Sequence, residues 1–205
     1  MKKIMFNDEF GLTEAVLNGK KTMTRRICKY DRPNENYEIV FPVFEPEEYD
    51  NDGNITSKLD RAFGWRDKGG NFTGWNIPKY RIGEIVAVAQ CYHSFYNDEC
   101  DPRMFPSGAG WLNKMFVKPE LMPHKIQITD ISIQKLQDIS DEDCLKEGIN
   151  EATRDSPWYW YEYNNKKFIF NEPRQAFASL IDKVSGKGTW ERNQYVFVYE
   201  FKLIK

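Results

Sequence analysis

The chain has no long hydrophobic run and no large excess of charge of either sign. No stretch of about 18 consecutive apolar residues occurs, as a membrane-spanning helix would need, and acidic residues appear at Asp8 and Glu9 before a hydrophobic segment of signal-peptide length has formed. We therefore expect a cytoplasmic protein with no membrane partner. Its 29 lysines and arginines are balanced by 31 acidic residues, for a net charge of −2. The chain as a whole does not attract nucleic acid, so any surface that binds it must be local.

Histidine is scarce, and cysteine is scattered. The two histidines, His93 and His124, leave little material for a Ser-His-Asp or Cys-His catalytic group. The absence of a Cys-x-x-Cys pair favours reduced thiols over a disulfide framework. Cys91, His93 and Cys100 offer three zinc ligands, but their spacing matches no standard site and no fourth ligand lies nearby. We therefore predict no metal and no other cofactor.

Cations and hydroxyls are concentrated in residues 19–26, Gly-Lys-Lys-Thr-Met-Thr-Arg-Arg. The apolar spacing just before this run predicts a short amphipathic helix, capped at Asn7 or Asp8 and ending at Asn18-Gly19. A strand should follow.

In that strand, Thr22, Thr24 and Arg26 would share one face. A face of two hydroxyls and a guanidinium suits an anion or the polar edge of a base. The alternative is a solvated edge strand that carries cations to prevent aggregation.

The length of 205 residues suits one domain, and we assign residues 1–205 to a single α+β domain. Glycine, proline and amide residues predict loop and hairpin insertions at about 30–80 and 96–123. Between these insertions, the apolar run at residues 85–89 predicts a buried central strand. A third insertion, at about 150–171, is rich in aromatic residues.

The segment after residue 125 predicts a bent strand and then a short helix. Isoleucines alternate on both sides of Thr129-Asp130 but change parity there, as they would at a β-bulge. A curved strand suits a small barrel. Ser140 is followed three residues later by an acid, which predicts a helix that ends at Gly148.

Two more elements close the chain. A helix beginning at Pro173 would place four apolar residues in the core, and residues 195–201 have the composition of a strand. The four core positions are Phe177, Leu180, Ile181 and Val184.

Glu147 falls in the last turn of the predicted helix, where the helix dipole disfavours a carboxylate. It is either exposed, where the penalty is small, or a proton donor. If the fold brings it to Lys21 and Thr24, the three residues supply a hydroxyl nucleophile, an amine base and a carboxylic acid.

Aromatic residues make up 15% of the chain. Those at residues 158–161 and 168–170 flank Asn164-Asn165, which predicts an aromatic hairpin. Its rings can stack on unpaired bases or pack onto the core of the domain. We favour packing, because large aromatics dominate small cores.

The order of these features resembles the ASCH family, which is similar to the PUA superfamily of small barrels. The helix, the run at 19–26, the strand after Gly83-Glu84, the block from Lys125 to Gly148 and the closing strand occur in the family's order. Phage and prophage ASCH-like proteins resemble the chain most, through Met122-Pro123 and residues 186–190 (Gly-Lys-Gly-Thr-Trp). The resemblance implies a PUA-like mixed β-barrel with flanking short helices. It also implies a cleft, lined by the Lys-Thr-x-Thr-x-Arg run, that binds RNA or modified nucleosides.

The resemblance further implies which residues bind and react. Small bacterial ASCH proteins include amidohydrolases that remove the acetyl group of N(4)-acetylcytidine with a lysine, a threonine and a glutamate. These roles fall on Lys21 as base, Thr24 as nucleophile, and Glu147 as the group that positions the reactants or moves a proton, with no metal. The ligand-binding residues implied by the motif are Lys20, Lys21, Thr22, Thr24, Arg25 and Arg26.

The chain departs from phage relatives after the strand at residues 85–89. They usually continue with a segment like Arg-Glu-Thr-Trp, whereas this chain has Ala-Gln-Cys-Tyr at 89–92. Gln90 would therefore contact a base edge through its amide, in place of a charged pair.

Three hypotheses result. The first is binding of RNA or a nucleoside-like ligand, and the second is deacylation of an N(4)-acylcytidine. The third is a phage-derived scaffold that binds a protein partner through the aromatic hairpin.

Overall fold

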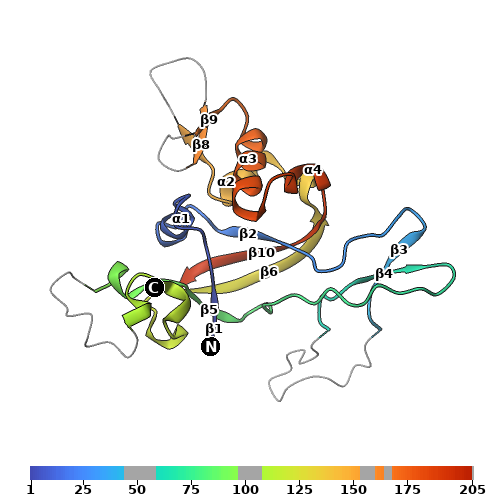
Figure 1. Ribbon diagram of the computed structural model, residues 1–205, viewed down its shortest axis with the longest axis horizontal. Coiled ribbons are helices and arrows are strands. Elements are labelled where there is room, and N and C mark those ends of the chain that lie inside the picture. The colour runs from blue at the N-terminus through green and yellow to red at the C-terminus, as the bar shows by residue number, and fades with distance from the viewer. Residues whose placement is uncertain (44–58, 97–107, 153–159, 164–167, 205) are drawn as a thin grey trace.

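The structure is a computed structural model that describes residues 1–43, 59–96, 108–152, 160–163 and 168–204 (Figure 1). Its main element is a five-stranded sheet with the strand order β1-β5-β6-β10-β2. The strands are β1 (Lys2–Ile4), β5 (Ile85–Val88), β6 (Lys125–Lys135), β10 (Tyr195–Ile204) and β2 (Met23–Ile27). Only β1 and β5 are parallel, and every other neighbouring pair in this sheet is antiparallel.

Two smaller sheets and four α-helices complete the described fold. β3 (Tyr37–Val40) pairs with β4 (Gly64–Asp67), and β8 (Trp160–Tyr163) pairs with both β7 (Asn150–Ala152) and β9 (Phe168–Phe170). The helices are α1 (Leu12–Leu17), α2 (Asp141–Lys146), α3 (Pro173–Ser185) and α4 (Thr189–Arg192). Short 3-10 helices span Tyr92–Ser94, Gly108–Gly110, Lys114–Phe116, Pro119–Leu121 and Leu136–Asp138.

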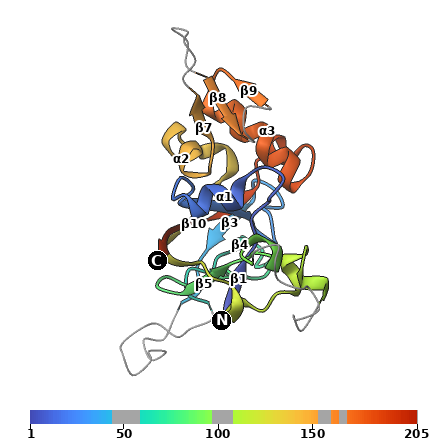
Figure 2. The same ribbon diagram turned by 90° about the vertical axis from the view of Figure 1, so that its left-hand side faces the viewer.

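The predicted α+β class is confirmed. Helices α2 and α3 gather with β8 and β9 at one end of the molecule, whereas the β3–β4 hairpin extends away from the sheet (Figure 1). Turned by 90°, the molecule shows α1 between the α2–α3 group and strands β1 and β5 (Figure 2). In the described part of the chain, β1 and β2 are the edges of the main sheet, and no strand pairing closes it into a barrel. No helix among these residues is long and apolar enough to cross a membrane.

The predicted bend in β6 is confirmed as a β-bulge. Asp130 pairs with Glu200 and Ile128 pairs with Phe201, so Thr129 has no partner across the strand pair. The extra residue keeps the isoleucines on both sides of it directed toward the core, although their parity changes.

The predicted strand at 85–89 is confirmed as β5, which lies between β1 and β6 with its last three residues fully buried. The predicted hairpin is confirmed by the pairing of β8 with β9. Tyr163 of β8 is buried, packs against Phe10 and Phe170, and hydrogen bonds Ser179, so this part of the hairpin belongs to the core. Trp158 and Tyr159 lie outside the described residues.

Two helix predictions need correction. α1 begins at Leu12, after Gly11 in a left-handed conformation, and not at a cap formed by Asn7 or Asp8. Asn7 and Asp8 instead organise the preceding turn, where Asn7 accepts a hydrogen bond from the Phe10 amide. On α3, three of the four predicted core residues are buried, but Val184 is 37% exposed. Val184 lies in the last turn of α3, which lines a pocket.

Candidate functional site

The site forms where the segment between α1 and β2 meets the end of α2. The amides of Lys20 and Lys21 both donate to the Ala15 carbonyl of α1, and the Thr22 amide donates to the Lys146 carbonyl of α2. These bonds satisfy carbonyls that the helix ends leave open. Because α2 ends one residue before Glu147, they also bring Lys21 and Glu147 together across 126 positions of sequence.

Glu147 lies between two cations inside the protein. Lys21 Nζ is 2.5 Å from Glu147 Oε2, and Arg25 Nη1 is 3.1 Å from Oε1. Lys21 Nζ also donates to the Glu147 backbone carbonyl at 2.6 Å. Lys21 is 2% exposed and Glu147 4%. The two cations offset the unfavourable position of a carboxylate at the end of a helix, and charge-assisted hydrogen bonds fix its orientation.

Arg25 holds Glu147 in place. Its guanidinium donates to Glu147 and to Asp143, and it lies 5.9 Å from the centre of the Phe177 ring. With the Gln134 amide turned so that its oxygen faces Arg25, Nε and Nη2 donate to that oxygen at 3.0 and 2.6 Å. A guanidinium engaged on so many sides positions its neighbours and has little capacity left for a ligand.

Burial changes the acid–base character of Lys21. Desolvation lowers the pKa of the Lys21 amine below its usual range, and the nearby Arg26 and Arg25 lower it further, while Glu147 opposes the change. The amine therefore loses its proton more readily than a surface lysine does. Proton transfer between Lys21 and Glu147 requires no movement, because the two groups are already hydrogen bonded.

A pocket with a volume of about 210 Å³ opens beside this cluster. Lys21, Thr24, Arg26 and Glu147 supply polar groups to its wall, and Phe6 is among its apolar residues. Thr24 and Arg26 share a strand face, as predicted. Lys21 is of the other parity, but it reaches the same pocket because β2 is an edge strand and the pocket lies at that edge.

The Thr24 hydroxyl is accessible from the pocket. Within the described residues, Thr24 Oγ1 makes no hydrogen bond. In the same part of the chain, Glu162 Oε2 is the one side-chain oxygen or nitrogen that is fully buried without a partner, so Thr24 Oγ1 is not fully buried. Since Thr24 Oγ1 lacks a partner and is not fully buried, it must be open to the pocket. It is therefore free to bind a ligand group or to react with one.

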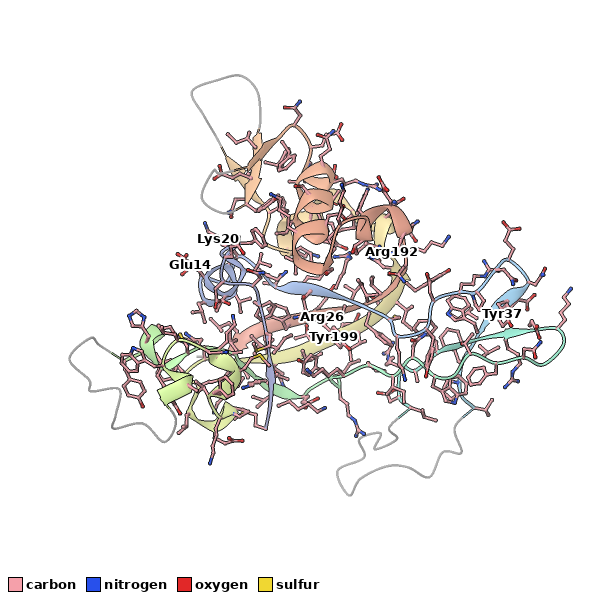
Figure 3. All side chains as sticks on the ribbon, viewed as in Figure 1. Glu14, Lys20, Arg26, Tyr37, Arg192 and Tyr199 are labelled. Atoms are coloured by element: carbon pink, nitrogen blue, oxygen red, sulfur yellow. The ribbon has the colours of Figure 1, made fainter. Side chains whose placement is uncertain are left out.

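Three predicted ligand-binding residues do not line this pocket. Lys20 is exposed at the end of α1, as Figure 3 shows, and borders a separate small hollow. Thr22 takes part through its backbone bond to Lys146. Gln90 is buried, bonds His124 Nδ1 at 2.7 Å, and borders a third hollow.

Sequence reasoning also missed parts of the site. Asn7 and Ser185 line the pocket, and Asp143 and Gln134 hold Arg25. The signal that could have suggested Asp143 is its position one helical turn before Glu147, since residues four apart share a helix face. No local pattern indicates Gln134, which lies on β6.

The buried thiols are not reactive groups. Burial raises the pKa of the Cys28 and Cys144 thiols to about 12, which keeps both protonated near neutral pH. Cys100 lies outside the described residues. Among the residues that the structure does describe, no three or more His, Cys, Asp or Glu side chains gather as metal ligands would.

Comparison with known proteins adds no assignment: no family model, no curated protein and no solved structure matches this chain. The functional argument therefore rests on the pocket and the residues around it.

Proposed function

We propose that the chain is an ASCH-like protein on a PUA-like scaffold, and that it binds RNA or a modified nucleoside in the pocket beside Glu147. The observation that carries this proposal is the immobilised ion cluster at the pocket wall. Lys21, Arg25 and Glu147 are held by one another, so a ligand meets polar groups that are already oriented. Such preorganisation is typical of sites that recognise a specific polar edge.

The size and lining of the pocket favour a single base. At about 210 Å³ it is smaller than the roughly 300 Å³ at which pockets for drug-sized ligands begin. A nucleobase offers donors and acceptors along one edge and flat apolar faces on both sides. The Thr24 hydroxyl and the Glu147 carboxylate can pair with that edge, while Phe6 and the end of α3 contact the ring.

The charge of the pocket lining favours a ligand with an anionic group close to the bound ring. The pocket is lined by the cations Lys21, Arg25 and Arg26 and by one carboxylate, that of Glu147. Arg26 is partly exposed, and its Nη2 is anchored to the Met5 carbonyl at 2.6 Å. A nucleotide or an RNA strand therefore suits the site better than a cationic molecule does.

Deacylation of an N(4)-acylcytidine is the second candidate, favoured by the lowered pKa of Lys21 and the open Thr24 hydroxyl. Neutral Lys21 forms when its proton passes to Glu147. Thr24 Oγ1 then bonds to the acyl carbon and gives its proton to Lys21 Nζ. The carbon–nitrogen bond breaks, the departing N4 takes that proton, and cytidine leaves. Water attacks the acyl-threonine in the same manner and releases acetate and free Thr24.

The experiment is titration calorimetry of the purified protein with cytidine and N(4)-acetylcytidine, beside an assay for released acetate. The matched pair of variants is Thr24→Val, which removes the hydroxyl in the pocket, and Thr22→Val, which makes the same change two residues away outside it. We expect binding by the wild type and Thr22→Val, and at least tenfold weaker binding by Thr24→Val, as loss of a hydrogen bond to a buried ligand group implies. Absence of binding by every protein, or equal binding by both variants, would overturn the proposal.

The acetate assay separates binding from catalysis. Acetate release by the wild type that is lost in Thr24→Val and Lys21→Met, while ligand still binds one of these variants, would support the amidohydrolase. Binding without acetate release by the wild type would exclude this substrate and leave a binding protein.

A further inference from the structure

A larger hollow, different from the three cavities described above, lies on the other side of Arg26 from the pocket. It has a volume of about 460 Å³ and lies between strands β2 and β10 and the segment at residues 76–80. We call it the basic groove, after its cationic lining residues Arg26, Lys29 and Lys79. Tyr199 of β10 also lines it, and Figure 3 shows Arg26 and Tyr199 close together near the centre of the molecule.

The groove is positively charged, although the chain has a net charge of −2. Its lining includes the three cations and no carboxylate. Among the described residues, none of the three forms an ion pair. Lys29 Nζ lies 4.7 Å from the centre of the Tyr30 ring, and Lys79 Nζ lies 5.4 Å from that of Tyr80. Cation–π contacts of this kind orient the ammonium groups and leave their charge uncompensated.

The tyrosines of the groove do not cancel this charge. Burial raises the pKa of both Tyr80 and Tyr199 to about 12, so both phenols are neutral at physiological pH. Tyr199 accepts a hydrogen bond from the Lys79 amide, which holds the segment bearing Lys79 against β10. The groove is thus a fixed surface with three unneutralised cations.

The groove adjoins the pocket. Met5, Arg26 and Ile27 line both, and the bond from Arg26 to the Met5 carbonyl holds the guanidinium at the boundary. A ligand whose ring fills the pocket can therefore extend past Arg26 into the groove. The part that enters the groove must be anionic for its charge to match.

We infer that the basic groove binds phosphate, and that the ligand of the pocket is a nucleotide within a single RNA strand and not a free nucleoside. This inference rests on the proposed function, because it assigns the neighbouring base to the pocket. Arg26 contacts the phosphate next to the bound base, and Lys29 and Lys79 each contact one further phosphate along the strand. A single strand fits because its bases are free to turn into a pocket while its backbone follows a basic groove.

The test measures binding of three probes to the full chain: N(4)-acetylcytidine, its 5′-monophosphate, and a short single-stranded oligoribonucleotide with one N(4)-acetylcytidine. Each is titrated between 50 and 200 mM salt. Three phosphate contacts to a single strand imply a slope of about −2 in log K against log salt, which is a loss of roughly 20-fold over this range. We expect the nucleoside to bind with no such dependence and the oligonucleotide to bind most tightly.

Variants test whether the groove causes the salt dependence of oligonucleotide binding. The double variant Lys29→Gln/Lys79→Gln should reduce the loss over the same salt range to roughly 3-fold, because about one contact remains. It should leave affinity for the nucleoside unchanged, and Lys29→Arg/Lys79→Arg should retain the wild-type slope. Lys202→Gln is the matched control. It removes an exposed lysine of β10 that alternates to the opposite face from Tyr199 and lines neither hollow.

The outcomes separate this inference from the proposed function. If the nucleoside binds but the oligonucleotide binds no more tightly, or if the double variant keeps the full slope, the basic groove is refuted as a phosphate site. If the monophosphate binds as tightly as the oligonucleotide, the phosphate is terminal and the RNA strand is refuted. If the double variant weakens RNA binding but Thr24→Val changes nothing, the groove stands and the base pocket fails.

Discussion

Glu147→Gln should strongly destabilise the protein, although the two side chains have nearly the same size and shape. The substitution keeps the shape of the side chain but removes its charge, leaving Lys21 and Arg25 buried together without the carboxylate that compensates them. Removing one partner of a buried ion pair costs about 3–5 kcal/mol, whereas an exposed pair contributes about 1 kcal/mol or less. For a chain of this size, that cost lowers the melting temperature by roughly 6–20 °C.

The assay is urea unfolding followed by tryptophan fluorescence, with Glu142→Gln as the matched control. Glu142 is exposed on α2, the helix that ends just before Glu147, and the same change there should alter the free energy of unfolding by no more than about 0.5 kcal/mol. If the two variants unfold within about 0.5 kcal/mol of each other, the ion cluster is solvated and the reasoning about the site is refuted.

The same variant should show a characteristic pH dependence. The pKa of Lys21 is already lowered in the folded wild type, and loss of Glu147 removes the interaction that opposes this shift. The unfolded chain then binds more protons than the folded one between the lowered pKa and the ordinary lysine value of 10.5, so stability rises with pH across that window. The deficit of Glu147→Gln relative to wild type should therefore shrink as pH rises toward 10. A deficit that is constant with pH would show that Lys21 is not the group left uncompensated.

Three further predictions address the rest of the fold. Asp182→Asn should cost about 1 kcal/mol at pH 7, because amides near the start of α4 hydrogen bond the Asp182 carboxylate and hold its pKa below the usual range. Urea titrations should show the difference begin to shrink below pH 3.8, the ordinary Asp pKa, and disappear only below the lowered pKa of the folded protein. Leu180→Ala should cost about 2–5 kcal/mol in the same assay and Val184→Ala less than about 1 kcal/mol, and equal costs would contradict the placement of Val184 at the pocket. Iodoacetamide at pH 8 should not modify Cys28 or Cys144 of the native protein, as mass spectrometry would show, until urea unfolds the chain. Rapid alkylation without urea would contradict their burial.

Local signals in the sequence were sufficient for much of the fold. The parity change at Thr129-Asp130 identified a bulge to the residue, because side-chain alternation has a strict period of two and one extra residue must reverse it. Gly148 was identified as a helix stop and has a φ of 99°, which residues with a Cβ rarely adopt. Val184 shows the limit of such signals, since helical periodicity gives the face of a residue but not how far the core extends along the helix.

The site was less predictable, because its members meet through contacts that no local pattern records. Lys21 and Glu147 meet through the hydrogen bond from the Thr22 amide to the Lys146 carbonyl at the end of α2. This is a backbone bond between distant segments, so no residue type or spacing in the sequence indicates it. Gln90 follows β5, which is separated from β2 by β6 and β10. Distance along the sheet does not exclude Gln90, because Met5 and Phe6, which follow the more distant strand β1, do line the pocket. Gln90 is instead buried, bonds His124 Nδ1 and borders a different hollow.

The role of Arg25 depends on its neighbours more than on its own chemistry. The motif assigns both Arg25 and Arg26 to ligand binding, although strand alternation places only Arg26 on the face shared by Thr22 and Thr24. In the fold, Arg25 is buried against Asp143, Glu147 and Phe177, whereas Arg26 lies between two hollows and keeps donors free for a ligand. Both arginines line the pocket, but Arg25 completes the ion cluster in its wall, whereas Arg26 also reaches the basic groove. If this division is correct, Arg25→Lys should lower stability and Arg26→Lys should lower RNA affinity, each with little effect on the other property.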